Sequence, residues 1–111
     1  MEPQVFVIDD DQAVRDSLGL LLRSMGQKAR LFESAQAFLD EYDATMAGCL
    51  VLDIRMPGMS GMELQQRLRA IDCTMPIIFV TGHGDVPMAV EAMHQGAFDF
   101  IQKPFRDQEL L

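Results

Sequence analysis

Short apolar runs alternate along the whole chain with segments whose apolar residues recur at helical spacing, and this alternation constrains the fold more than any other feature. Apolar runs of this length match strands that are buried on both faces of a sheet. Strands that alternate with helices form a parallel sheet covered by helices on both sides. We assign strands to residues 5–8, 28–32, 49–52, 76–81 and 98–101. The sequence therefore predicts an α/β protein with a parallel sheet, and the mixed polarity of 28–32 predicts an edge strand.

The segments between these strands carry helical patterns with recognisable ends. Asp11 and Ser34 suit the cap positions of the first two helices, and Gly26 and Gly96 suit the ends of the first and fourth. The expected apolar faces carry Val14, Leu18, Leu21, Leu22 and Met25; then Ala35, Phe38, Leu39 and Tyr42; then Leu64, Leu68 and Ile71; and lastly Val86, Val90 and Met93. Residues 107–111 match the first turn of a fifth helix. We expect one domain over residues 1–111 with an incomplete last helix, inside a longer protein.

Acidic residues outnumber basic ones, which excludes several classes of function. The 111 residues include 17 acidic and 9 basic side chains, for a net charge of −8. This balance repels nucleic acid and anionic membranes, and the basic residues are scattered, so we expect no direct binding to either. The chain starts without a secretory signal pattern, and no apolar run approaches the roughly 20 residues that span a bilayer. We therefore expect a soluble cytoplasmic protein, in which Cys49 and Cys73 are buried, reduced thiols.

Polar side chains follow four of the five predicted strands at their carboxyl ends. The residues in question are Asp9, Asp10 and Asp11 after the first strand, Asp53 after the third, Thr81 at the end of the fourth and Lys103 after the fifth. Ligands of open α/β sheets bind outside the carboxyl ends of the strands, near the point where the strand order reverses. We expect these side chains to converge on one crevice.

The chemistry of such a crevice is that of phosphoryl transfer with a metal ion. Clustered carboxylates raise one another's pKa unless a cation lies between them, and a set of oxygen ligands without His or Cys favours Mg²⁺. An aspartate can serve as a nucleophile that forms an acyl phosphate, while Lys103 and Thr81 bind phosphoryl oxygens. Taken singly, each residue has an ordinary role: Asp11 caps a helix, Thr81 packs, and Lys103 is solvated. Their occurrence together favours the phosphoryl site.

At these residues the sequence resembles the response-regulator receiver family of two-component systems, within the CheY-like superfamily. The matching segments are residues 7–11, 52–61, 80–85 and 96–105, and the resemblance spans nearly the whole chain. It implies a doubly wound, flavodoxin-like (βα)5 fold with strand order 2-1-3-4-5. Residues 81–96 are similar to the FixJ subfamily, whose members join a receiver to a LuxR-type helix-turn-helix domain.

The resemblance also implies a role for each site residue. The implied roles are Asp53 as phosphoacceptor; Asp10, Asp53 and the backbone carbonyl of Arg55 as direct ligands of Mg²⁺ (or Mn²⁺); Asp9 as a ligand through water; Thr81 as the switch hydroxyl; Lys103 as its charge partner; and Phe100 as the aromatic switch. The implied phosphoryl donor is a phosphohistidine of a sensor histidine kinase. The implied output is a DNA-binding domain that regulates transcription, with homodimerisation through the fourth helix and fifth strand. Such a domain is a switch that assists its own phosphorylation and dephosphorylation, and it is not an enzyme with a separate substrate.

Three other functions remain as alternatives. A phosphatase like the haloacid dehalogenases needs a second Asp two positions after the nucleophile, where this chain has Arg55. A flavodoxin-like cofactor binder conflicts with the three aspartates after the first strand, because they would repel the phosphate of FMN. A degenerate receiver that only binds partners conflicts with the intact set of site residues. His94 is expected on the surface, and His83 is left open between a loop role and an influence on phosphoryl lifetime.

Overall fold

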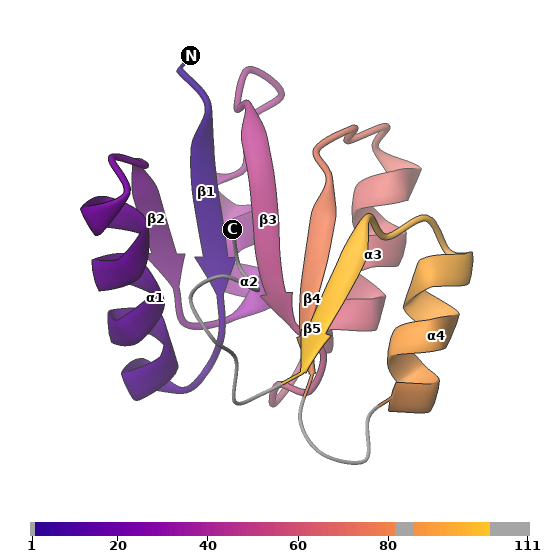
Figure 1. Ribbon diagram of the computed structural model, residues 1–111. Coiled ribbons are helices and arrows are strands. Elements are labelled where there is room, and N and C mark those ends of the chain that lie inside the picture. Colours follow the sequence, from indigo (N-terminus) through magenta and orange to yellow (C-terminus); the bar gives the residue numbers. More distant parts are fainter. Residues whose placement is uncertain (1, 82–85, 103–111) are drawn as a thin grey trace.

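A computed structural model describes residues 2–81 and 86–102 of the chain (Figure 1). Within these ranges strands and helices alternate as predicted. The elements are β1 Gln4–Ile8, α1 Gln12–Ser24, β2 Ala29–Phe32, α2 Ala35–Glu41, β3 Gly48–Asp53, α3 Gly61–Ala70, β4 Ile77–Thr81, α4 Val86–His94 and β5 Asp99–Gln102. The fifth helix expected at 107–111 lies outside the described residues. No helix within the two ranges combines the length and the apolar character needed to cross a bilayer.

The strands form one parallel sheet in the order β2-β1-β3-β4-β5, which confirms the predicted fold and the edge position of β2. The chain runs from β1 outward to β2, and then returns to place β3 on the other side of β1. This reversal lies between β1 and β3, where ligands of such sheets bind. The register pairs Ile8 with Leu52, so the carboxyl ends of β1 and β3 lie side by side.

Two hydrophobic clusters hold the helices on the sheet (Figure 1). On one face, α1 packs Leu18 and Leu22 against Val7, Val51 and Val80. On the other face, α2, α3 and α4 pack against the larger cluster, whose fully buried members include Phe6, Ile8, Phe38, Leu50, Leu52, Leu64 and Phe79. Successive residues of a strand point to opposite faces, which is why adjacent residues such as Val7 and Ile8 belong to different clusters.

Side-chain caps fix where three of the helices begin. The carboxylate of Asp11 accepts from the backbone N–H of Ala13 at 2.9 Å, and the hydroxyl of Ser34 accepts from that of Ala37 at 3.0 Å. Both caps were predicted from the sequence. A third, Ser60, caps α3 by accepting from the N–H of Glu63 at 3.1 Å. Each cap satisfies one of the N–H groups that the first turn of a helix leaves unpaired.

The predicted apolar face of α4 is wrong at Val90, which is 46% exposed. The helix buries Ala89 and Ala92 instead, with Met93 partly buried beside them. Small side chains let the helix lie close to β4 and β5, so the alanines face the sheet and the larger valine faces outward. Its carboxyl end is tied to α3 by Gln65, whose Nε2 donates to the backbone oxygen of Ala92 at 3.1 Å.

Two other apolar residues also lie outside their predicted elements. Helix α3 ends at Ala70, and Ile71 follows it as a cap residue that is 52% exposed. Strand β5 begins at Asp99, and Phe98 before it is 69% exposed. Both cysteines are free, as expected, but each is partly exposed and not buried. The partial burial of Cys49 still raises the pKa of its thiol, which favours the protonated form.

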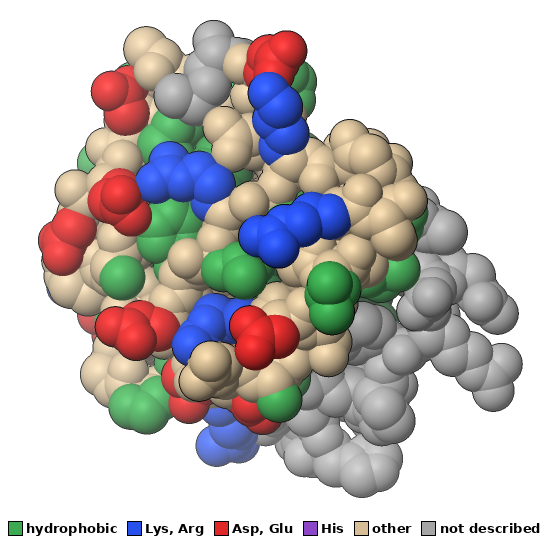
Figure 2. All heavy atoms as spheres, turned by 90° about the vertical axis from the view of Figure 1, so that its left-hand side faces the viewer, with side chains coloured by type: hydrophobic (Ala, Val, Ile, Leu, Met, Phe, Trp, Pro, Cys, Tyr) green, Lys and Arg blue, Asp and Glu red, His purple; other side chains and the backbone are tan. Residues whose placement is uncertain are grey.

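Charged side chains of both signs are interspersed on the surface that carries α1 and β2 (Figure 2). Two basic residues there form ion pairs, Lys28 with Glu2 and Arg30 with Glu41, the latter at 3.1 Å. Three of the four side chains are well exposed and Arg30 is partly exposed, so these surface pairs contribute little to stability. The described residues form no continuous basic patch on this face, in agreement with the scattered basic residues of the sequence.

Candidate functional site

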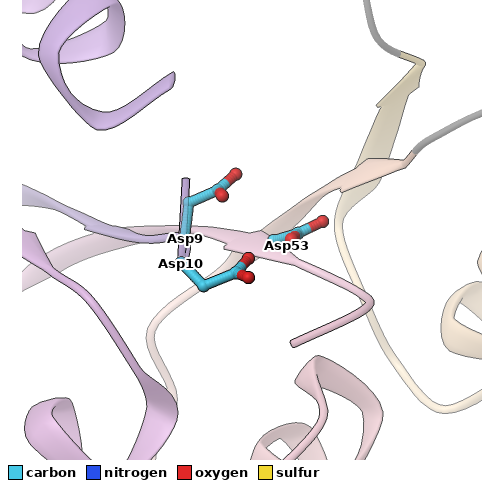
Figure 3. Close-up of side chains that lie close together, drawn as sticks. All are labelled: Asp9, Asp10 and Asp53. Carbon is cyan, nitrogen blue, oxygen red and sulfur yellow. The ribbon is translucent and has the colours of Figure 1, made fainter. Parts of the chain in front are cut away.

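Three aspartates from the neighbouring ends of β1 and β3 come together (Figure 3). Asp9 and Asp10 directly follow β1, and Asp53 is the last residue of β3. One carboxylate oxygen from each lies within 4.8 Å of the others. Asp9 and Asp53 are buried, with 2% and 7% of their surfaces exposed, whereas Asp10 is exposed. The cluster is therefore open to solvent on one side and enclosed by the sheet on the other.

Asp9 is held at its backbone and at its side chain. Its N–H donates to the carbonyl of Phe32 in β2 at 3.1 Å, and its carboxylate accepts from the N–H of Asp11 at 2.9 Å. The guanidinium of Arg15 in α1 donates to its backbone carbonyl at 2.8 Å. Sequence reasoning missed Arg15. The position of Arg15, one turn after the cap residue Asp11, is compatible with this contact, because a helical side chain leans toward the amino end of its helix.

The segment after Asp53 folds back onto the sheet before α3 begins. The N–H of Ile54 donates to the carbonyl of Val80 at 3.4 Å, and the N–H of Gly61 donates to the carbonyl of Ile54 at 2.9 Å. Ile54 and Met56 are both buried, so these two side chains of the loop pack inward. Arg55 is exposed. An open groove of about 380 Å³ beside this loop is lined by Ile54, Arg55, Met56, Pro57, Ser60 and Met88.

The donor set fits a hard divalent cation. Within residues 2–81 and 86–102, the three carboxylates offer oxygen ligands only, and no imidazole or thiolate of these ranges belongs to the cluster. Mg²⁺ is bound in this manner, by few carboxylates together with several waters. Asp10 is exposed among the described residues, so its carboxylate is accessible to water. Of the predicted ligands, Asp9, Asp10 and Asp53 are thus brought together.

The other predicted site residues are placed less completely. Thr81 ends β4, and because Asp53 pairs with Val80, the Thr81 backbone lies one residue past the partner of Asp53. The side chain of Thr81, and all of Lys103 and His83, lie outside the described part of the chain. Phe100 lies on β5 opposite Phe79 and packs partly buried against the larger core cluster. His94 is exposed on α4, which confirms its predicted surface position.

Replacing Asp10 with asparagine is expected to stabilise the metal-free domain by about 1 to 3 kcal/mol. Three negative charges within 4.8 Å repel one another, and this change removes one of them while nearly keeping its shape. The free energy of unfolding should be measured by urea denaturation in EDTA. Asp40→Asn is the matched control, since Asp40 is exposed and Asn keeps its role as acceptor from Gln36. Equal effects of the two substitutions would contradict the expected repulsion.

Comparison with known proteins assigns this arrangement to a family. The family model described as "Response regulator receiver domain" matches residues 5–111. The transcriptional regulatory protein FixJ of Bradyrhizobium diazoefficiens is 55% identical over 106 residues, which cover 96% of this chain and 52% of FixJ. The response regulator protein TodT of Pseudomonas putida is 49% identical over 107 residues, covering 96% of this chain and 47% of TodT. The chain thus spans about half the length of these curated relatives.

Solved structures agree with the sequence comparisons. The response regulator StyR superposes with a TM-score of 0.93 at 53% identity, over 99% of this chain and 56% of that one. The crystal structure of FixJ-N superposes with a TM-score of 0.91 at 46% identity, over 99% of this chain and 88% of that one. The family match agrees with the strand order and the acidic cluster, and the chain belongs to the response regulator receiver domain family.

Proposed function

We propose that this domain is the phosphoacceptor switch of a two-component system, in which Asp53 takes a phosphoryl group in the presence of Mg²⁺ or Mn²⁺. The observation that carries this proposal is the approach of Asp9, Asp10 and Asp53 to within 4.8 Å at the reversal point of the sheet. A site built for a neutral or anionic organic ligand would not gather three carboxylates there. A divalent cation that binds a phosphoryl group is held by carboxylates of this kind.

The chemistry assigned to Asp53 is a nucleophilic displacement at phosphorus. A carboxylate oxygen of Asp53 attacks the phosphorus of a phosphohistidine, the P–N bond breaks, and the imidazole leaves with the electron pair and takes up a proton. When bound, the cation would neutralise charge on the phosphoryl oxygens and help to orient the phosphoryl group for attack by Asp53. Asp10, Asp53 and the backbone carbonyl of Arg55 would hold this cation directly, and Asp9 would act through water.

The switch residues belong to the same proposal. Thr81 would hydrogen-bond one oxygen of the phosphoryl group on Asp53, and Lys103 would pair with another. Movement of Thr81 toward the phosphoryl group would make room for Phe100 to turn inward from its partly buried position on β5. The domain would thereby assist its own phosphorylation and dephosphorylation, and the added dianion would bias a two-state equilibrium.

The partners of the whole protein are part of the proposal as well. The phosphoryl donor would be a sensor histidine kinase in the cytoplasm, and residues 1–111 would form the receiver of a longer regulator with a helix-turn-helix output domain. The printed names of the relatives, a transcriptional regulatory protein and response regulators, support such an output. The exposure of Val90 on α4, next to β5, supports a phosphorylation-dependent homodimer through these two elements.

The test is phosphorylation by a small donor, followed by intact mass spectrometry. Incubation with acetyl phosphate and Mg²⁺ is expected to add the mass of one phosphoryl group to the wild type. Asp53→Asn should abolish this gain, because an amide oxygen is too weak a nucleophile to form the acyl phosphate. EDTA in place of Mg²⁺ should also abolish it.

Asp11→Asn is the matched control for this experiment. Asp11 lies beside the cluster but outside it, and asparagine caps a helix as well as aspartate does. This variant should gain the phosphoryl mass at nearly the wild-type rate. Modification of Asp53→Asn to the same extent as wild type would refute the assignment of the phosphoacceptor.

A further inference from the structure

Arg15 makes the contact that ties helix α1 to the acidic cluster. Its side chain is partly buried, and its Nη1 donates to the backbone oxygen of Asp9 at 2.8 Å. That oxygen belongs to the peptide group between Asp9 and Asp10, the residues that offer two of the three clustered carboxylates. We infer that Arg15 is a positioning residue for the cation site, because it fixes the peptide that joins Asp9 to Asp10. The inference rests on the proposed function, since it takes the cluster to be a cation site.

Because the peptide group is planar, this contact constrains both Asp9 and Asp10. A peptide is a rigid plane that includes the α-carbons on both sides of it, so fixing its oxygen constrains the directions of both flanking side chains. The registers of β1 with β2 and with β3 both end at Ile8, so this peptide lies beyond the last paired residue of the strand. Arg15 supplies a charged donor to this peptide group. A hydrogen bond from a charged donor is stronger than one between neutral groups.

Two further contacts make the turn rigid around the same peptide. The N–H of Asp9 donates to the carbonyl of Phe32, and the N–H of Asp11 donates to the carboxylate of Asp9. Together with Arg15, these contacts hold the N–H, the side chain and the carbonyl of Asp9. Ligand carboxylates that are oriented before the cation arrives lose less conformational entropy on binding.

The contacts that begin α1 and pack it on the sheet are made by side chains other than Arg15. The helix begins at the Asp11 cap and packs through Leu18 and Leu22 on the sheet. A variant without the guanidinium should therefore remain folded. Methionine is the suitable replacement, because it keeps an unbranched apolar stem of similar length and removes the donor.

The positive charge of Arg15 makes the experiment decisive, since charge and positioning act in opposite directions. A guanidinium beside the cluster repels an incoming cation, so a purely electrostatic role predicts that its removal strengthens Mg²⁺ binding. A positioning role predicts weaker binding. Loss of a partner that orients metal ligands typically weakens metal affinity about 10-fold to 100-fold.

The experiment compares Arg15→Met with Arg23→Met. Arg23 lies on the same helix, is exposed in its last turn, and loses the same charge on substitution. Isothermal titration with Mg²⁺ at constant ionic strength is expected to give a dissociation constant about tenfold higher for Arg15→Met and an unchanged one for Arg23→Met. The amide NMR signals of residues 9–11 in the metal-free protein should shift in Arg15→Met only.

The outcomes separate this inference from the function on which it rests. Mg²⁺ binding by Arg15→Met as tight as that of Arg23→Met, or tighter, overturns the positioning role and leaves the proposed function standing. Wild-type protein that binds no Mg²⁺ overturns both. If Arg15→Met does not fold, Arg15→Lys takes its place, because lysine keeps the charge but its nitrogen falls short of the position of Nη1. It too must bind Mg²⁺ several-fold more weakly, and equal binding again overturns the role.

Discussion

Replacing Gly48 with alanine is expected to destabilise the domain by about 4 kcal/mol or more, the sum of a backbone strain and a steric clash. Gly48 has φ of +131°, a conformation that side chains of L-residues rarely adopt. A β-carbon built there would lie 1.8 Å from the backbone oxygen of Gln4 and 2.7 Å from its nitrogen. Gln4 and Gly48 form the first register pair between β1 and β3, so the two central strands would have to separate at this end. Urea denaturation measures the loss.

Gly58→Ala is the matched control, because it shares the strain without the clash. Gly58 has φ of +75°, and a β-carbon there would have no atom within 4 Å. Its substitution should destabilise by only about 1 to 2 kcal/mol, the usual difference for a left-handed residue that is not glycine. A Gly48→Ala variant that loses no more stability than Gly58→Ala would mean that the ends of β1 and β3 separate freely.

The order of the elements could be predicted from the sequence because strand and helix leave different periodicities. Runs such as residues 5–8 and 49–52 are apolar at consecutive positions, and the structure buries residues 6–8 and 50–52 of these runs on both faces of the sheet. Helix α1 carries a clear apolar stripe, and its predicted residues Leu18 and Leu22 are buried. Where one stripe is much more apolar than the rest of the helix, the pattern alone selects the buried face.

The same reasoning failed at α4, where the pattern is ambiguous. Val90, Ala89 and Ala92 are all apolar, and hydrophobicity ranks the valine above the alanines. The structure buries the alanines, because the closeness of the helix to β4 and β5 favours small side chains. This distance is a property of the assembled sheet. Nothing local in residues 86–94 specifies it.

The candidate site also has a part that the sequence predicts and a part that it does not. The sequence alone predicts the proximity of Asp9, Asp10 and Asp53, because the carboxyl ends of neighbouring parallel strands meet at one edge of the sheet. The contact of Arg15 with the carbonyl of Asp9 was not predicted, because the position of Arg15 one turn after Asp11 allows this contact without specifying it. A side chain that binds a backbone group leaves no pattern of residue types, and its partner depends on the path of the turn between β1 and α1.

Replacing Gly61 with alanine is expected to destabilise the domain by about 3 kcal/mol or more, and to weaken Mg²⁺ binding about tenfold or more. A β-carbon at Gly61 would lie 2.2 Å from the backbone oxygen of Asp53 and 3.1 Å from the α-carbon of Ile54. These are backbone atoms that cannot turn away. Either α3 moves outward, breaking the 2.9 Å hydrogen bond from Gly61 to Ile54, or Asp53 itself is displaced. Gly19→Ala, whose β-carbon would meet only the flexible side chain of Leu31 at 3.3 Å, should stay within about 1 kcal/mol of wild type.

The comparison of Gly61→Ala with Gly48→Ala separates the stability of β3 from the geometry of its acidic end. Both clashes lie on this strand, at Gly48 where it begins and beside Asp53 where it ends. Loss of stability alone lowers the apparent Mg²⁺ affinity only through the folded fraction, which denaturation curves in EDTA supply. After this correction Gly48→Ala should bind Mg²⁺ as wild type does, and Gly61→Ala should remain weaker. If the corrected affinities of the two variants agree, the close packing of Gly61 against Asp53 serves the fold alone, and the position of Asp53 tolerates a shift of α3.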